Sequence, residues 1–270
     1  MACRDDYILI IMIGLIAITT DFGDLYPGIM KGVIASISDD IRIIDITNSI
    51  PPGDIVQGAF VLRYASTYFP RGTTHLAVVD PAVGSGRRAI IILGEQYSFV
   101  GPDNGLLILA AQAQGRYRVY EIAAPNFYRG EVSPVFHGRD IFAPAAAFIA
   151  SGEPVPGLRE IFDPVELDLG VPTQDENGVR GRTIYVDSFG NLVTNIGSET
   201  VLELLSPGEA VEVNGAQATF VNTYSDGEKG DLLMLIGSHG MAEIAVNGDS
   251  AAAYIGIRAG DKIRIVAQKR

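Results

Sequence analysis

The chain has 270 residues, of which 47% are hydrophobic and 19% are charged, a composition typical of a folded protein with a buried core rather than a disordered one. It holds 32 Asp and Glu against 20 Lys and Arg, a formal net charge of −12, and no run of basic residues, so we expect no nucleic acid partner. The single cysteine, Cys3, excludes an internal disulfide and a cysteine-rich zinc site, which fits a cytoplasmic location.

An apolar run covers residues 7–18 near the N-terminus. A membrane span needs about 20 such residues, and the polar sequence T-T-D-F-G follows the run in place of a small-residue cleavage site. We therefore expect neither a membrane anchor nor a secretion signal, and we interpret the end of the run as a buried β-strand. Residues 1–13 are interpreted as an extension, because Met12 could begin the compact protein.

Strands and helices alternate along the first half of the chain. Apolar runs predict strands at residues 15–20, 41–46, 74–80, 89–93 and 97–100, and apolar residues at helical spacing predict helices at 29–38, 54–69, 104–114 and 140–151. This alternation favours an α/β domain with a mainly parallel sheet. The nearly continuous apolar character of residues 41–46 predicts a strand that is covered on both faces.

The pattern changes after residues 152–181, which are rich in Pro, Gly and acidic residues. Short β-rich runs follow, with turn signals such as Asn-Gly between them, and closely spaced hairpins predict a small antiparallel β-barrel. The runs lie at residues 182–186, 192–196, 210–213, 218–222, 232–236, 242–246, 252–257 and 262–267. We therefore expect an N-terminal α/β domain at residues 12–165, a linker at 166–180 and a C-terminal β-barrel domain at 181–270.

The sequence G-S-G-R-R-A at residues 84–89 matches the dinucleotide-binding pattern G-x-G-x-x-A. That pattern requires a helix to begin at the second glycine, but the next residues, 89–93, are predicted as a strand, so a hairpin turn is the better interpretation. Neither the P-loop pattern nor G-x-S-x-G occurs. The sequence therefore does not support phosphate-loop or nucleophile-elbow chemistry.

The three histidines, His75, His137 and His239, have no local metal-ligand spacing, and we expect no metal site. His75 falls in a predicted strand and is interpreted as structural. His137 lies in the polar sequence F-H-G-R-D directly before a predicted helix. Helix capping by Asp140 would explain Asp140 but would leave His137 and Arg139 unexplained.

Acidic residues stand at the carboxyl ends of three of the predicted strands: Asp80 is the last residue of one, and Asp21 and Asp103 come after the other two. In an open α/β sheet, ligands bind beyond the carboxyl ends of the strands. A turn before Pro81 would explain Asp80 alone, but three acidic residues in equivalent places predict a polar cleft at this edge of the sheet.

Six short blocks, each with a different sequence, follow one another along the chain. They are T-T-D-F-G at 19–23, D-P-A-V-G at 80–84 with Arg87 and Arg88, P-D-N-G at 102–105, F-H-G-R-D-I-F-A-P at 136–144, D-S-F-G-N at 187–191 with T-N-I at 194–196, and E-I-A-V-N at 243–247. Together they resemble the S-adenosyl-L-methionine hydroxide adenosyltransferases (S-adenosylmethionine hydrolases), relatives of fluorinase and chlorinase. The resemblance begins near residue 15 and reaches the C-terminus. It implies an α/β domain followed by a β-barrel domain, and a homotrimer whose sites lie between the N-domain of one subunit and the C-domain of its neighbour.

The resemblance also implies roles for single residues. It places a water-activating trio on Asp80, Arg87 and His137. The implied substrate contacts are Asp21 at the ribose hydroxyls, Phe189 and Asn191 at the adenine, Asp187 and Ser238 at the methionine end, and Val246 in the last block. In two places the chain departs from the family pattern: Ala82 replaces the usual Gly, and the loop after Asp21 is about two residues shorter, so no contact is assigned within 24–28.

The implied reaction is hydrolysis of S-adenosyl-L-methionine, in which activated water attacks C5′ and gives adenosine and L-methionine without a metal or organic cofactor. Because the sulfonium is an excellent leaving group, the task of the enzyme is to position and activate water. A chlorinase-like, halide-dependent adenosyl transfer is the nearest alternative, but the halogenating relatives lack the trio, and the fluorinase insertion is absent here. A non-catalytic adenosine or S-adenosylmethionine binding module would keep Asp21, Phe189 and Asn191 without needing the trio.

Overall fold

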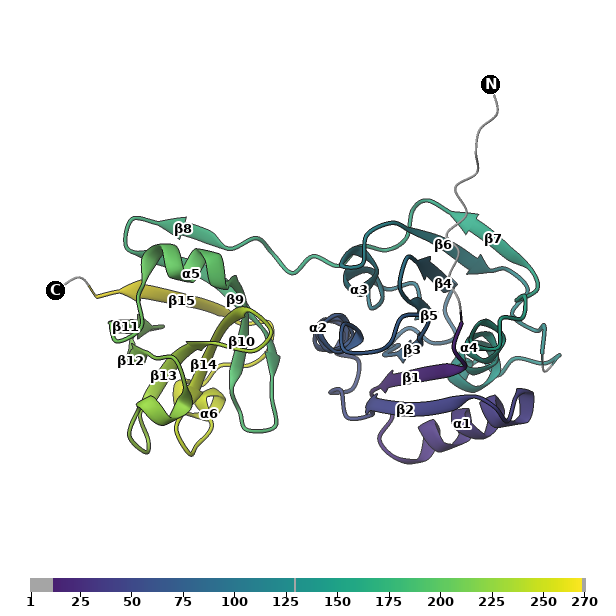
Figure 1. Cartoon of the computed structure of the whole chain (residues 1–270), viewed down its shortest axis with the longest axis horizontal. Helices are drawn as coiled ribbons and strands as arrows, with labels where there is room; N and C mark the ends of the chain where they lie inside the picture. The colour runs from purple at the N-terminus through teal and green to yellow at the C-terminus, as the bar shows by residue number, and fades with distance from the viewer. Residues whose placement is uncertain (1–11, 129, 269–270) are drawn as a thin grey trace, which may run out of the picture. The chain divides into compact units, whose positions relative to one another are not determined.

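The computed structural model describes residues 12–128 and 130–268, and the chain divides into two compact units on either side of the Leu167–Asp168 bond (Figure 1). The extension expected at residues 1–13 lies outside the described residues, apart from its last two. The segment 166–180, expected as a linker, contains the short strand β8 (Thr173–Asp175) and the beginning of β9 (Gly178–Val186).

Unit 1 is a sheet with helices on both faces (Figure 1). Its strand order within the described residues is β2-β1-β3-β5-β4-β6-β7, and β2, β1, β3 and β5 run parallel, whereas β4, β6 and β7 extend the sheet antiparallel. The strands are β1 (Leu15–Thr20), β2 (Arg42–Thr47), β3 (Thr74–Val78), β4 (Ala89–Gly94), β5 (Ser98–Pro102), β6 (Tyr117–Ile122) and β7 (Leu158–Ile161). The helices are α1 (Leu25–Ile37), α2 (Ile55–Ser66), α3 (Ile108–Gln112), the π-helical turn η1 (Gly138–Phe142) and α4 (Ala143–Ala150).

Alternate side chains of β3 and its extension pack into two separate cores. Leu76 and Val78 pack with residues of α1 and α4, whereas Ala77 and Val79 pack with residues of α2 and α3. Burial on both faces is the reason that this strand is apolar at consecutive positions. No helix in the described part of the chain is both long and apolar enough to cross a bilayer.

The prediction that residues 41–46 are covered on both faces is wrong. β2 is an edge strand, none of its residues is buried, and Ile44 is 47% exposed. The apolar run reflects β-propensity and pairing with β1 rather than full burial.

The sequence predicted a hairpin turn between β3 and β4. This prediction is wrong, because β5 lies between these two strands in the sheet. β4 does follow the glycines, so the helix that a dinucleotide site needs is absent there. Since Ala89 at the beginning of β4 is opposite Pro102 at the end of β5, the segment passes along the carboxyl edge of the parallel strands.

Unit 2 is a β-barrel of the strands β9 to β15. The order β10-β14-β13-β12-β11-β15-β9 is closed by pairing of β9 with β10, and neighbours are antiparallel except for β12 and β13. The remaining strands are β10 (Leu192–Gly197), β11 (Ala210–Val213), β12 (Ala216–Phe220), β13 (Leu232–Ile236), β14 (Met241–Val246) and β15 (Lys262–Ala267). Helices α5 (Ser198–Leu204) and α6 (Ala251–Ile255) and the 3-10 turn η2 (Tyr224–Asp226) lie between strands.

The strand predicted at residues 252–257 is instead the helix α6. Ser250 caps its first turn, with its Oγ accepting the Ala253 N–H at 3.1 Å, and Gly256 ends it in the left-handed region at φ +68°. A serine N-cap, consecutive alanines and a terminal glycine all favour a helix, and these signals outweigh the apolar character of the run.

Candidate active site

Two of the predicted carboxylates lie at the carboxyl edge of the sheet in unit 1. Asp21 follows β1 and Asp80 comes two residues after β3, and these strands are parallel neighbours. The Gly53 N–H donates to Asp21 Oδ2 at 2.7 Å, and a Cβ placed on Gly53 would lie 3.5 Å from the Cβ of Pro81, the residue after Asp80. Asp21 Oδ1 is buried and has no hydrogen-bond partner among the described residues. A buried acceptor of this kind is costly until a donor reaches it.

The structure brings Asp80, Arg87 and His137 together. Arg87 Nε lies 3.0 Å from both carboxylate oxygens of Asp80, and Arg87 Nη2 also donates to Asp80 Oδ2. The same Nη2 lies 2.7 Å from Nδ1 of His137. The guanidinium packs over the Phe142 ring at 5.1 Å, and the Arg87 and Asp80 side chains are only 8% and 3% exposed. Arg87 is therefore a buried bridge between the acid and the imidazole.

The contact with Arg87 determines the tautomer of His137. Arginine has donors only, so Nδ1 accepts and the ring proton is on Nε2. Burial lowers the pKa of His137 below its usual value, and the positive charge of Arg87 lowers it further, while Asp80 and Asp140 oppose this shift. Near pH 7 the imidazole is therefore neutral and offers Nε2–H as a donor.

Close backbone packing joins the two segments that carry the trio. Gly84, in the segment after Asp80, has φ +80°, and a Cβ at this position would lie 2.4 Å from the carbonyl oxygen of Pro134. Glycine is required on both grounds. The contact seats residues 80–87 against the segment that leads to His137.

The alternative interpretation of Asp140 as a helix cap is wrong. Asp140 is buried in the turn η1, where its carboxylate accepts the Ser133 N–H at 2.9 Å and pairs with Arg139 at 2.7 Å. It therefore fastens the segment before His137 to the turn after it.

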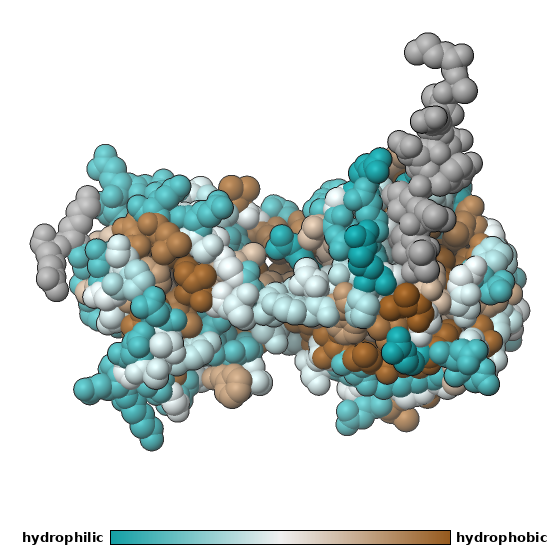
Figure 2. All heavy atoms as spheres, viewed as in Figure 1, coloured by the Kyte–Doolittle hydropathy of each residue, from teal (hydrophilic) through white to brown (hydrophobic). Residues whose placement is uncertain are grey.

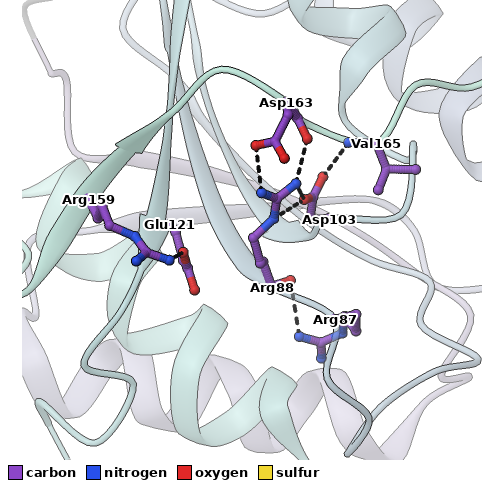
Figure 3. Close-up of polar contacts among 7 residues, drawn as sticks. All are labelled: Arg87, Arg88, Asp103, Glu121, Arg159, Asp163 and Val165. Carbon is purple, nitrogen blue, oxygen red and sulfur yellow. Dashed lines mark hydrogen bonds and ion pairs between the residues drawn. The ribbon is translucent and has the colours of Figure 1, made fainter.

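Arg87 and Arg88 point in different directions (Figure 3). Arg88 Nε donates to Asp103 at 2.7 Å and its Nη1 to Asp163 at 2.7 Å, and the Val165 N–H donates to Asp103 Oδ1 at 2.8 Å. The prediction that Asp103 contributes to the polar cleft is wrong. Its carboxylate is occupied by Arg88 and by a backbone N–H, and it anchors the last segment of unit 1.

In unit 2, a cavity of about 630 Å³ is lined by four of the predicted substrate residues. The Asp187 carboxylate organises the turn that presents the next two: Oδ1 accepts the N–H groups of Phe189 at 2.8 Å and Asn191 at 2.9 Å, and Oδ2 accepts Asn191 Nδ2 at 2.9 Å. The Phe189 side chain is 77% exposed, as a packing surface for a planar ligand would be. Val246, at the end of β14, completes this set.

Ser238 is the one predicted substrate residue of unit 2 that is not among the lining residues of this cavity. It is exposed in the turn between β13 and β14. Tyr224 was not predicted from the sequence, but it lines the cavity and donates from its hydroxyl to Glu243 Oε1 at 2.5 Å. Burial raises the pKa of Tyr224, and the bond to Glu243 raises it further. The capping box formed by Thr223 and Asp226 was the available sequence signal for this turn.

Among residues 12–128 and 130–268, no group of three or more His, Cys, Asp or Glu side chains is arranged to hold a metal ion.

Comparison with known proteins places both units in one family. The sequence model of the SAM hydroxide adenosyltransferase N-terminal domain matches residues 16–159, and that of the C-terminal domain matches residues 181–264. The chain belongs to the SAM hydroxide adenosyltransferase family. This confirms the resemblance that the six blocks indicated and the α/β-plus-barrel fold that it implied.

Relatives within the family cover nearly the whole chain. The (R)-S-adenosyl-L-methionine hydrolase of Salinispora tropica is 40% identical over 258 residues, which are 93% of this chain and 97% of that protein. The crystal structure of an uncharacterized conserved protein from Thermotoga maritima aligns with a TM-score of 0.86 and 35% identity, over 93% of this chain and 99% of that one. The fluorinase of Actinopolyspora mzabensis is more distant, at 25% identity over 289 residues, 93% of this chain and 96% of that protein.

Proposed function

We propose that this member of the SAM hydroxide adenosyltransferase family hydrolyses S-adenosyl-L-methionine to adenosine and L-methionine. The observation that carries the proposal is the buried Asp80–Arg87–His137 constellation at the carboxyl edge of the sheet. Relatives that are 35–40% identical to the chain are named (R)-S-adenosyl-L-methionine hydrolases, which supports the same assignment.

The reaction is a displacement at C5′. The oxygen of water forms a bond to C5′ as the C5′–S bond breaks, and the electron pair of that bond neutralises the sulfonium and leaves with methionine. Water loses one proton in the process. Because the leaving group needs no protonation, the enzyme has to position water in line and stabilise its developing hydroxide character, which can be worth several kcal/mol.

We assign each member of the trio a role that its contacts support. Asp80 accepts a hydrogen bond, and then the proton, from water, and Arg87 supplies the fixed positive charge that stabilises developing hydroxide. His137, neutral and protonated on Nε2, orients the water oxygen by donating to it. This orienting role is supported by the 2.7 Å contact of its other ring nitrogen with Arg87, which leaves Nε2–H as the donor.

The other site residues hold the substrate. One carboxylate oxygen of Asp21 accepts the Gly53 N–H, and the other has no hydrogen-bond partner among the described residues. We assign the ribose hydroxyls of the substrate as its donors. Phe189 packs on the adenine and Asn191 bonds to it, while Asp187 and Ser238 bind the methionine end. Val246 closes the cavity beside them.

Halide-dependent transfer and non-catalytic binding fit the site less well. A halide needs a desolvated pocket without a strong base beside it, whereas Asp80 and His137 converge on Arg87. A binding module would not need to bury a charged pair, because burial of two ions is costly.

Product analysis tests the proposal. The protein is incubated with S-adenosyl-L-methionine in ¹⁸O-labelled water, with and without chloride or fluoride, and the products are separated by chromatography. We expect adenosine with the label at C5′ under all conditions. A 5′-halogenated nucleoside as the main product would establish halogenation, and unchanged substrate would establish a binding module.

We further propose a cytoplasmic homotrimer in which the unit 1 residues of one subunit and the unit 2 residues of a neighbour form each site. The proposal is supported by the division of the site residues between two separately packed units. Subunit contacts could be made by large exposed apolar side chains, such as Leu25, Val135 and Phe162. Figure 2 shows apolar patches on the surface, which are suited to the same purpose. The single cysteine supports a reducing compartment.

A further inference from the structure

A second cavity in unit 2, of about 440 Å³, is lined by basic side chains. Residues 168–270 contain eight Lys and Arg in all, and four of them line this cavity: Arg180, Arg182, Lys262 and Arg264. None of these four lines the cavity that holds Asp187 and Phe189. In a chain with a net charge of −12, half of the basic residues of one unit are therefore gathered at a place that the proposed hydrolysis does not use. We call it the basic cavity.

The strand register places these charges opposite one another. β9 and β15 pair antiparallel, with Lys262 opposite Arg182 and Arg264 opposite Arg180. Residues two apart on a strand share a face, so the four side chains form a block on one face of two strands. Like charges directly opposite each other destabilise a sheet. An arrangement that places four together is costly unless an anion offsets it.

The protein itself offsets this charge only in part. Asp175 on β8 lies 3.2 Å from Arg180 Nη2 and 3.5 Å from Arg264 Nη2, and its side chain is 40% exposed, so these ion pairs are weak. Within the described part of the chain, Arg182 and Lys262 make no ion pair. Four positive charges against one negative charge leave the basic cavity cationic.

Side-chain amides fix the backbone beneath the block. Asn214 Oδ1 accepts the Arg264 N–H at 2.7 Å, and its Nδ2 donates to the Lys262 carbonyl at 3.2 Å. Asn195 Oδ1 accepts the Arg182 N–H at 2.8 Å. A Cβ on Gly181 would lie 2.4 Å from this same Asn195 oxygen, so only glycine permits the contact. The cationic heads are free to face a ligand while their main chain is held in place, which is the property of a preorganised site.

We propose that the basic cavity binds a small anion that carries a chain of two or three phosphate groups, either inorganic or attached to a nucleoside. Three guanidinium groups can each bond two phosphate oxygens, and the charge excess of the cavity matches a ligand with about three negative charges. The volume lies within the range of about 300–1,000 Å³ that holds small-molecule ligands. The proposal does not depend on the proposed hydrolysis.

Calorimetry with inorganic tripolyphosphate at low salt tests the proposal. We expect saturable binding of one ligand per chain to the wild-type protein, and a loss of about 10-fold or more in affinity for Arg182→Gln and for Lys262→Gln, each of which removes one charge from the block. Arg258→Gln is the matched control, because Arg258 is an exposed basic residue of unit 2 that does not line the basic cavity. We expect its affinity to equal that of the wild type.

A thermal scan without phosphate gives a second readout. Lys262→Gln removes one pair of like charges across β9 and β15, so we expect its Tm to equal or exceed that of the wild type. Hydrolysis of S-adenosyl-L-methionine without phosphate should be unchanged in the same variant. If ATP binds with the same affinity as tripolyphosphate, the cavity recognises the phosphates alone. If ATP binds more tightly, the cavity also contacts the nucleoside. Absence of binding to either, or equal weakening by Arg258→Gln, would overturn the proposal.

Discussion

Arg87 contacts both other members of the trio, and this arrangement shapes what single substitutions should do. Its guanidinium holds the Asp80 carboxylate through Nε and Nη2 and reaches His137 Nδ1 from Nη2. The acid and the imidazole are thus linked through one shared group. Residues that act as a unit show non-additive effects on rate.

Asp80→Asn should reduce adenosine formation on the order of 10²-fold or more while changing substrate affinity little, because the lost interaction serves the transition state. His137→Ala should act in the same direction, and the double variant should be less impaired than the product of the two single effects. Steady-state and single-turnover kinetics measure both. Asp163→Asn, in the exposed Arg88 pair, is the matched control and should keep its activity. Normal turnover by Asp80→Asn would remove Asp80 from the chemistry.

Asp21→Ala should weaken substrate binding by about 1.5–3 kcal/mol, because charge-assisted hydrogen bonds to the ribose hydroxyls are lost. Calorimetry with a slowly hydrolysed substrate analogue measures the change. Asp39→Ala removes an exposed carboxylate after α1 and should bind as the wild type does. Equal affinities of the Asp21 and Asp39 variants would exclude Asp21 from the site.

His75 should make the stability of the protein sensitive to acid. It is fully buried beside Phe69, Tyr97 and Phe99, neither ring nitrogen has a hydrogen-bond partner among the described residues, and burial lowers its pKa from 6.5 to about 3. Below pH 6.5, His75 therefore becomes protonated in the unfolded chain but stays neutral in the folded chain. The contribution of the neutral ring is complete above pH 6.5 and is lost as the pH falls toward 3.

The slope from this one group is about 1.4 kcal/mol per pH unit. Denaturant unfolding of the wild type and of His75→Leu, between pH 6 and pH 4, should show the free energy of unfolding falling less steeply in the variant by about this amount. Parallel pH profiles would show that His75 does not couple to protonation.

At the scale of elements, the segment between β3 and β4 positions the trio. Gly84→Ala should strain this segment by about 1–3 kcal/mol, because φ is +80° and the new Cβ meets Pro134, and the activity should fall as Arg87 moves away from His137. Gly86→Ala is a control two residues away, with no atom within 4 Å of a Cβ and no left-handed φ. Activity assays and thermal scans of the two variants test the contrast, and equal behaviour would contradict it.

Strands and helices were predicted correctly where the local pattern of apolar residues was clear. Core strands such as β1 were predicted because burial on both faces favours consecutive apolar residues, here residues 15–18 of a fully buried strand. Strands β6 and β7 were missed, because they are only half-buried and their apolar residues are spaced out. The α6 segment was assigned to the wrong class, since its apolar residues outweighed the Ser250 and Gly256 caps in the prediction.

At the scale of the whole molecule, the proposed oligomer is the main expectation. Multi-angle light scattering should give a mass near three times the 28.8 kDa of the chain. Specific activity should fall on dilution to concentrations at which subunits dissociate, because each site would lose the residues that the neighbouring subunit contributes. A monomer that retains full activity would contradict both the trimer and the shared site.

The sequence by itself determined the two kinds of folding unit and the family, and it indicated the residues of the proposed site. Periodicity, turn residues and six ordered blocks are local properties of the chain, and they can be read without knowing which segments meet in space. For the same reason the unit 2 turn at Asp187, in which the contacts span four residues, was within reach of the sequence.

Only the tertiary structure decided how these residues are used. It brought His137 to Arg87 across 50 positions of sequence, and it gave Arg88 and Asp103 to an anchor of unit 1 rather than to the cleft. Strand register also placed four basic residues of β9 and β15 face to face. Such contacts depend on which strands are neighbours and on the direction of each side chain, and packing of the whole chain sets both.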